Sequence, residues 1–379
     1  MSITLPSDKV NEVKKCCSDL LQTNLPSIRA VSRTIGKIVA TFPAVQYGPL
    51  FYRALESDKI VALKINKGHF DRPMQLSQAA RYDLEWWIAN LHIVYSSILR
   101  KELDLELYSD ASGSGWGAKC MELNSSTGGR WNAEELVKAK NNEINYLELL
   151  AAFLGLKSFC TSMKNVHILL RIDNVTAVTY LQHMGGTRSC SCNEIANTIW
   201  KWCLERNIWL SISYIPGKLN VEADKLSRKF NDRTEWTLDK QAFNQITHYF
   251  GSPDIDLFAS RLNNQLPRYV SWLPDPSAFS VDAFSLNWAK FNFYAFPPFC
   301  LIPSCLQKIL NDKATGLLVV PNWPSQSWFP LLHIMTVGKP VEIKRRKGLL
   351  TLPFSNVTHP FWDRIDLLCC RISGNLSRD

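Results

Sequence analysis

Apolar side chains in the first hundred residues recur every three or four positions, which is the spacing of helices. In residues 27–40 they cover one side of a helix, and Ser27 stands where its hydroxyl can cap the first turn. No residue in this part has the pattern of a chemical site, so we predict a helical region that supports the rest of the chain. The same spacing predicts further helices at 7–23, 49–65 and 77–95.

The pattern changes after residue 100. Apolar runs and alternating segments predict strands at 103–110, 116–123, 129–132, 166–173 and 208–215. Helical spacing is found at 143–162, 174–184, 191–206 and 220–229. The segments 113–115 and 125–129 are rich in Gly and Ser, which is typical of turns. Three strands ahead of the first helix predict a mixed five-stranded sheet with helices on its faces.

Residues 231–379 are rich in proline and aromatic side chains, and apolar strands alternate with helical stretches. This alternation predicts a small α/β unit. We therefore expect a mixed α/β protein of three domains: a helical region (1–100), a mixed sheet with helices (101–230) and an α/β unit (231–379). In the last domain, strands are predicted at 254–259, 291–296 and 314–321, and helices at 302–311 and 326–333.

Composition adds little to this division. A hydrophobic content of 46% and 13 Trp in 379 residues indicate packed cores. The formal net charge of +9 suits a polyanionic partner but is also typical of a solvated surface. The sequence shows no secretory signal and no apolar stretch long enough to span a bilayer, so we expect a cytoplasmic or nuclear protein with no membrane partner, whose cysteines are reduced thiols.

Four acidic residues stand on four separate elements of residues 101–230. Asp110 and Asp173 end predicted strands, whereas Glu148 and Asp224 lie in predicted helices. A carboxylate at the end of an apolar strand is unfavourable unless a cation or a hydrogen-bond donor meets it. Because all four can meet at one edge of the sheet, we expect them to bind hard ions such as Mg²⁺.

Each acid has a simpler interpretation when it is taken alone. Asp173 with Asn174 can cap the following helix, and for this pair alone capping is the favoured role. Asp224 can be a solvated residue of an exposed helix, and Glu148 can lie on the flank of its own helix. The small residues after Asp110 favour a site, since they let a ligand approach closely.

Such a cluster suits phosphodiester hydrolysis. The reaction needs a water molecule in line with the phosphate and a stabilised leaving oxygen, and two divalent ions about 3.5–4 Å apart can supply both. Several carboxylates can hold two such charges close together, whereas neutral ligands cannot.

In residues 107–117, 145–151, 169–174 and 214–228, which contain the four acids, the chain resembles the ribonuclease H domain of reverse-transcribing elements. The resemblance implies cleavage of the RNA strand of an RNA–DNA hybrid. It places two Mg²⁺ ions, which Mn²⁺ can replace, on Asp110, Glu148, Asp173 and Asp224. Substrate contacts are predicted at Ser112, Asn174 and Tyr214. Many members have His at the position of Tyr214, and a tyrosine, with its pKa near 10, is a poor proton carrier at neutral pH.

The first hundred residues resemble the thumb and connection of the same elements, at 28–37, 47–53 and 83–87. The end of the ribonuclease H-like domain resembles gypsy-like and DIRS-like retrotransposons. The polymerase motif Tyr-x-Asp-Asp is absent from the sequence, so we predict no DNA synthesis by this polypeptide. It resembles a fragment of a longer polyprotein, which makes the reverse transcriptase palm of the same element an expected partner.

In residues 254–260, Asn263, 267–269, 282–284, 287–288 and 296–299, in that order, the third domain resembles phage-type DNA adenine-N6 methyltransferases. The resemblance implies a Rossmann-like α/β fold. The family implies S-adenosylmethionine near Asp256 and a flipped adenine at Pro297, Pro298 and Phe299. Phe296 stands where the family has the Asn or Asp that accepts a hydrogen bond from adenine. We therefore expect a methyltransferase-like fold without methylation; an α/β module with an incidental Pro-Pro turn stays open.

Three functions compete. The first is a ribonuclease H, and the second is a non-catalytic nucleic-acid-binding relic of a retrotransposon polyprotein. The third is an exonuclease or an integrase of the same fold. An exonuclease is disfavoured because no second acid follows Asp110 two residues on, and an integrase because its Glu comes last whereas Glu148 comes second.

Overall fold

The computed structural model describes residues 1–98, 101–230, 236–355 and 357–375. Contacts within the chain group it into two compact units. The first consists of Met1–Glu106, Glu148–Leu150 and Met163–Pro216, and the second of Leu107–Leu147, Ala151–Ser162 and Gly217–Asp379. The predicted three domains divide the chain differently, and their boundaries at 100/101 and 230/231 touch residues outside the described part. The three-domain division stays a prediction.

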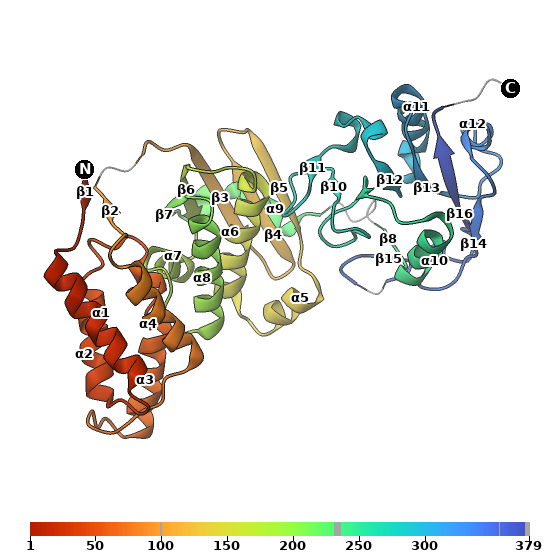
Figure 1. Ribbon diagram of the computed structural model, residues 1–379. Coiled ribbons are helices and arrows are strands. Elements are labelled where there is room, and N and C mark those ends of the chain that lie inside the picture. Colours follow the sequence, from red (N-terminus) through yellow and green to blue (C-terminus); the bar gives the residue numbers. More distant parts are fainter. Residues whose placement is uncertain (99–100, 231–235, 356, 376–379) are drawn as a thin grey trace. The chain divides into compact units, whose positions relative to one another are not determined.

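The N-terminal helices lie together in the first unit (Figure 1). The hydroxyl of Ser27 accepts a hydrogen bond from the N–H of Ala30, as predicted. The predicted helix at 49–65 is shorter, because a 3-10 turn, η1 (Gly48–Leu50), precedes it. The helices are α1 (Ser7–Gln22), α2 (Ile28–Val39), α3 (Arg53–Ile65) and α4 (Gln78–Asn90); β1 (Ser2–Ile3) pairs with β2 (Ser96–Ser97).

Aromatic side chains join these helices to the remainder of the first unit. Trp87 is fully buried and donates a hydrogen bond to the carbonyl of Phe51. The ring of Tyr47 lies 6.2 Å from that of Trp200 in α8 (Cys190–Leu204) and 5.9 Å from that of Trp209 at the start of β7 (Trp209–Tyr214). The helical region therefore packs on α8 and β7 as part of their core.

The predicted mixed five-stranded sheet is present, with the strand order β5-β4-β3-β6-β7. Strands β3, β4 and β5 are antiparallel neighbours, and β6 and β7 run parallel. These strands are β3 (Leu105–Ala111), β4 (Gly115–Cys120), β5 (Ser125–Arg130), β6 (His167–Ile172) and β7; the helices between and after them are α5 (Ala133–Lys140), α6 (Ile144–Cys160), α7 (Val175–Gln182), α8, η2 (Gly217–Leu219) and α9 (Val221–Arg228).

One prediction in this region is wrong, and one helix was not predicted. Residues 125–129 form most of β5 and not a turn; the chain turns at 121–124 instead. Gly128 is required in the strand because a Cβ there would lie 2.7 Å from the carbonyl of Trp116. Helix α5 was not expected, although Asn132 and Glu135 form a capping box at its start.

The C-terminal part of the second unit contains another five-stranded sheet, with the order β14-β16-β13-β12-β9. Strands β9, β12 and β13 run parallel, whereas β16 is antiparallel to both β13 and β14. This confirms an α/β unit, and its Rossmann-like character stays a proposal. The strands are β9 (Ile255–Asp256), β12 (Asn292–Ala295), β13 (Thr315–Pro321), β14 (Val341–Ile343) and β16 (Leu367–Ser373).

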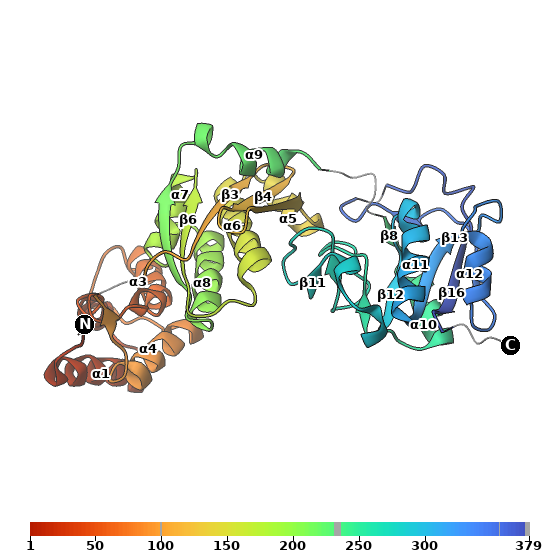
Figure 2. The same cartoon turned by 90° about the horizontal axis from the view of Figure 1, so that it is seen from above.

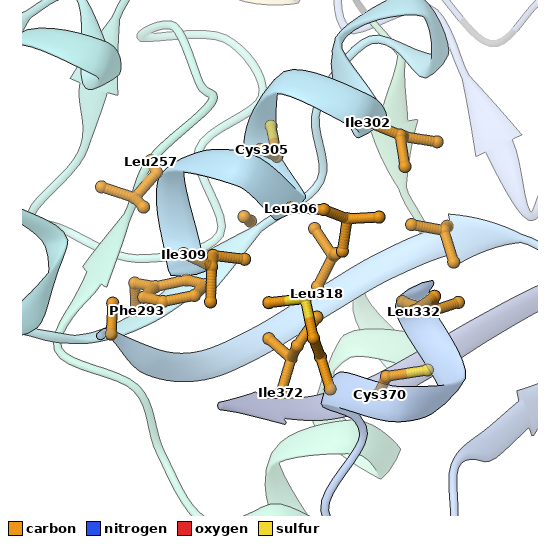
Figure 3. Close-up of a cluster of buried hydrophobic side chains, with 14 of the residues drawn as sticks. Leu257, Phe293, Ile302, Cys305, Leu306, Ile309, Leu318, Leu332, Cys370 and Ile372 are labelled. Carbon is orange, nitrogen blue, oxygen red and sulfur yellow. The ribbon is translucent and has the colours of Figure 1, made fainter. Parts of the chain in front are cut away.

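Helices cover both faces of this sheet (Figures 1 and 2). On one face α11 (Ile302–Asp312) and α12 (Phe329–Met335) enclose a buried apolar cluster, in which Leu306 and Ile309 point toward Leu318 of β13 (Figure 3). On the other face α10 (Lys240–Phe250) packs through Phe243 and Ile246. Shorter elements complete the part: β8 (Thr237–Leu238), β10 (Val270–Ser271), β11 (Ser280–Val281), β15 (Leu350–Thr351), η3 (Ala283–Ser285), η4 (Trp288–Lys290) and η5 (Phe299–Leu301).

Within the second unit, Arg261 binds the segment that joins β5 to α5. Its guanidinium donates to both carboxylate oxygens of Glu135, at 3.0 and 2.9 Å, and to the carbonyl of Arg130 at 2.9 Å. The side chains of Arg261 and Glu135 are only 14% and 13% exposed. A bidentate pair removed from water in this way orients its two segments strongly.

Arg261→Met is therefore expected to lower the free energy of unfolding by about 3 kcal/mol, because it leaves the carboxylate of Glu135, which is only 13% exposed, without its cation. Chemical denaturation followed by tryptophan fluorescence measures this loss. Arg364→Met, at an exposed arginine of the same unit, is the control and should change stability little. Equal stability of the two variants would show that the pair does not stabilise the fold.

Across the described ranges, none of the helices combines the length and the apolar composition that crossing a membrane requires.

Candidate metal centre

Asp110 lies where strand β3 meets the start of helix α9. It is 3% exposed and pairs with Gly117 of β4 across the sheet. The side-chain amide of Asn220, directly ahead of α9, donates a 2.9 Å hydrogen bond to the carbonyl of Ser109. The carbonyl of Ala223 lies so close to Gly117 that a Cβ there would come within 2.3 Å of it. Helix α9 is thus fixed on the strand pair that carries Asp110.

Three of the four predicted acids come together. Asp110, Glu148 and Asp173 each offer one carboxylate oxygen, and these oxygens lie within 4.8 Å of one another. Asp110 and Glu148 are buried and Asp173 is half-buried. Negative charges this close repel unless a cation lies between them, and carboxylate oxygens are the ligands that Mg²⁺ prefers. The three residues therefore fit a hard divalent ion.

Asp224 lies in the first turn of α9 and is outside this group of three. Its carboxylate accepts a 2.7 Å hydrogen bond from Nε of Arg228, one turn further along the helix, and the pair is roughly half exposed. The helix that carries Asp224 is packed against β4 beside Asp110, but its side chain is engaged by Arg228. A role as fourth ligand stays a prediction.

The structure separates the roles of Asp173 and Asn174. Asn174 is the N-cap of α7, and its Oδ1 accepts the N–H of Ala177 at 2.9 Å. Asp173 belongs to the acidic group instead. The capping role weighed for the pair therefore falls to Asn174, and its predicted contact with substrate is untested.

Ser112 holds the turn between β3 and β4. Its hydroxyl donates to the carbonyl of Ser227 at 2.6 Å and accepts the N–H groups of Ser114 and Gly115. The side chain is 6% exposed. These contacts tie the turn after Asp110 to the end of α9, which makes Ser112 a positioning residue for the acids; its predicted substrate contact is untested.

Tyr214 ends β7, and its side chain is 47% exposed. The structure places it at an accessible strand end, where it can contact a ligand. Its predicted role in substrate binding is untested.

The predicted methyltransferase residues lie in and after β9 and β12. Asp256 is 2% exposed, and its two oxygens accept the backbone N–H groups of Phe258 and Gln265 at 3.3 and 3.0 Å. Burial raises the pKa of its carboxyl to about 7. The carboxylate thus holds the chain after β9 in place, and both of its oxygens are used by the protein itself.

Phe296, Pro297, Pro298 and Phe299 follow β12 directly. The ring of Phe296 lies 6.2 Å from that of Phe299, which packs on Trp323. Phe296 and Pro298 line a cavity of about 540 Å³. No side chain in this segment can accept a hydrogen bond from an adenine amine, so the residues present do not fit the family's adenine site.

The residues that fix α9 and engage Asp224 were not predicted from the sequence. Asn220 and Gly117 hold α9 beside Asp110, and Arg228, in α9 itself, binds Asp224. Arg228 follows Asp224 by four residues, a spacing that allows an ion pair on one helix face and was visible in the sequence. The role of Gly117 depends on the approach of a distant helix, which no local pattern reveals.

No protein-family model and no curated protein matches the chain. Among solved structures, ribonuclease H1 of Halobacterium salinarum is 17% identical, and the match covers 32% of this chain and 92% of that one with a TM-score of 0.24. LC11 ribonuclease H1 in complex with an RNA/DNA hybrid is 22% identical over 32% and 93%, with a TM-score of 0.26.

A foamy viral protease-reverse transcriptase in complex with double-stranded DNA matches more of this chain. It is 13% identical, and the match covers 56% of this chain and 35% of that one with a TM-score of 0.21. All of these TM-scores are below 0.5. We therefore infer the function of the chain from the geometry of the site itself.

Proposed function

We propose that the chain is a metal-dependent ribonuclease that hydrolyses the RNA strand of an RNA–DNA hybrid. The observation that supports it is the gathering of Asp110, Glu148 and Asp173 with one oxygen each inside 4.8 Å. The three come from a strand, a helix and the residue after another strand, so the cluster requires the folded sheet. Carboxylates this close repel one another, and a divalent cation bound between them would remove that repulsion.

In this proposal Asp110, Glu148 and Asp173 hold the first of two Mg²⁺ ions, for which Mn²⁺ can substitute, and Asp224 completes the second site. When bound, the ions would activate a water molecule and stabilise the leaving oxygen. Asp110 and Glu148 are buried, so their role is to fix the ligand geometry. Asp224 is half exposed and must leave Arg228 to join them.

The wider setting is also a proposal. The helical region corresponds to the thumb and connection, and the reverse transcriptase palm of the same DIRS-like element is the proposed partner. The C-terminal part is a degenerate methyltransferase-like unit that neither binds S-adenosylmethionine nor transfers methyl groups. The expected compartment is the cytoplasm or the nucleus.

A second candidate is a nucleic-acid-binding relic without catalysis. It is favoured by the engagement of Asp224 with Arg228, since a nuclease needs that carboxylate for its second ion. Tyr214 also favours this candidate, because it stands where many members of the resembled family have His, and a tyrosine is a poor proton carrier at neutral pH.

A cleavage assay separates the two. The purified chain is incubated with an RNA–DNA hybrid labelled on its RNA strand, with Mg²⁺ or Mn²⁺, beside Asp110→Asn. The proposed nuclease shortens the RNA strand, and the variant does not. Cleavage by the unmodified chain no faster than by the variant would leave only the binding function.

A further inference from the structure

Strand β5, an edge strand of the sheet β5-β4-β3-β6-β7, is bound by the C-terminal part of the second unit. The hydroxyl of Thr127, a residue that is only 1% exposed, donates to the carbonyl of Pro274. At the end of the strand, the carbonyl of Arg130 accepts a 2.9 Å hydrogen bond from the guanidinium of Arg261. The C-terminal part is therefore attached to the neighbour of β4, and α9 packs on both of these strands.

The side chain of Arg130 lies between two aromatic rings. Its guanidinium carbon is 4.6 Å from the ring centre of Phe230 and 4.4 Å from that of Phe354. All three residues are half-buried, so water screens the attraction between the cation and the rings less than it would on an open surface. We name these three residues the Arg130 clamp. They come from three segments: the end of β5, the chain just after α9, and the turn that follows β15.

Phe354 is anchored in the C-terminal part. Strand β15, directly ahead of its turn, pairs with β8, and Leu350 of β15 is 3% exposed in the apolar cluster that α10 covers. Within the turn, the N–H of Ser355 donates to the carbonyl of Leu352 at 3.1 Å. The ring of Phe354 is therefore presented to Arg130 by backbone that is tied to the core of the C-terminal part.

Phe230 connects the clamp to α9, which ends two residues before it. The N–H of Lys229 donates to the carbonyl of Lys225 at 3.0 Å and closes the last turn of this helix. The ring of Phe230 lies directly on the backbone of Gly115 in β4, because a Cβ there would come within 2.4 Å of its Cζ. A ring that is held between β4 and Arg130 fixes the point at which the chain leaves α9.

We propose that the Arg130 clamp makes the C-terminal part a support for α9, and through α9 for Asp224 of the metal centre. Asp224 lies in the first turn of this helix of eight residues, so a fixed C-terminal end limits how far the first turn can tilt. The inference rests on the proposed nuclease, in which Asp224 completes the second metal site. Arg130, Phe230 and Phe354 are positioning residues, since they act through α9. The C-terminal part thereby has a role that needs no S-adenosylmethionine.

The first test measures the order of α9 by hydrogen–deuterium exchange of the full chain in EDTA, where neither metal nor cleavage contributes. Phe354→Leu keeps an apolar side chain but removes the ring face that attracts the cation. It is expected to speed amide exchange of residues 225–229 about tenfold, because a cation–ring contact is worth a factor of about two to thirty. Phe354→Tyr retains the face and should retain slow exchange. So should the control Phe361→Leu, at a phenylalanine of the same part that is 56% exposed.

Arg130→Met checks that the clamp acts as a unit. It removes the guanidinium but keeps the backbone carbonyl that Arg261 binds. The variant should speed exchange in α9 at least as much as Phe354→Leu, and adding Phe354→Leu to it should have no further effect, because the contact is already lost. Additive effects of the two substitutions, or unchanged exchange of α9 in Phe354→Leu, would overturn the proposal.

The second test asks whether the clamp serves the metal centre. The rise in unfolding temperature with added Mg²⁺ should need about threefold more Mg²⁺ in Phe354→Leu, and as much as in the unmodified chain in Phe354→Tyr and Phe361→Leu. Faster exchange in α9 with an unchanged Mg²⁺ requirement would overturn the link between the clamp and the metal centre. An unmodified chain that Mg²⁺ neither stabilises nor activates would overturn the nuclease itself, and the exchange result would still decide whether the clamp supports α9.

Discussion

Glu148→Gln is expected to reduce hybrid cleavage by on the order of 10²-fold or more while hybrid affinity changes little. The substitution keeps the size of the side chain but removes one of three negative charges whose oxygens lie within 4.8 Å of one another. Loss of that charge weakens the hold on a divalent ion. In the proposed nuclease, most contacts to the phosphates of the hybrid are expected from residues outside the acidic group, so binding should persist when the chemistry fails.

Single-turnover rates with saturating enzyme give the effect on chemistry, and binding in EDTA gives the effect on affinity. A second readout is the rise in unfolding temperature on adding Mg²⁺, which should shrink in the variant because a weaker site stabilises the fold less. Glu134→Gln, at an exposed glutamate of α5, is the control and should keep both properties. A large loss of affinity with an unchanged rate would contradict the proposed role of Glu148.

The strands that form the frame of the site could be predicted from sequence because their patterns are local. Strands β3, β6 and β7 follow apolar or alternating runs, and the observed bounds differ from the predicted ones by one or two residues. The predicted helix at 77–95 ends five residues early at Asn90, because the periodic apolar positions continue past the end of the hydrogen-bonded turns.

Errors arose where a distant segment determines the local structure. The Gly- and Ser-rich composition of β5 is typical of a turn. In the structure its glycines allow β4 and Leu226 of α9 to pack close to the β5 backbone. Strand β16 was not predicted, and it lies between β13 and β14 in the second sheet although β14 precedes it in sequence. The apolar run of β16 is visible in the sequence, but its place between β13 and β14 is not, because that place depends on distant strands.

The residues of the candidate site also differ in how far sequence could predict them. Residue type and position were enough to predict Asp110, Glu148 and Asp173 as a group, and the structure brings the three together. Whether Asp224 joins the group or pairs with Arg228 could not be predicted, because it depends on the rotamers of these two side chains on a helix face that is open to water. An exposed ion pair of this kind is weak, at about 0.3–0.5 kcal/mol, so a divalent ion can displace it.

Gly117→Ala is expected to lower the cleavage rate by about 10²-fold, because it moves the helix that carries Asp224. A Cβ at this position would lie 2.3 Å from the carbonyl of Ala223 and 2.7 Å from Cβ of Leu226. Real Cβ atoms do not come so close to backbone, so α9 must shift away from β4. Asp110 stands opposite Gly117 in the sheet, and the shift therefore changes the distance between Asp110 and Asp224.

The matched control is Gly113→Ala, in the turn between the same two strands. A Cβ at Gly113 would meet no atom within 4 Å, so this substitution adds the same methyl group without moving α9. Both variants are compared in single-turnover cleavage and in chemical denaturation, where Gly117→Ala should also lose about 1–3 kcal/mol of stability by overpacking. A stable Gly117→Ala that cleaves as fast as Gly113→Ala would show that catalysis does not depend on where α9 lies, and Asp224 would then be excluded as a ligand.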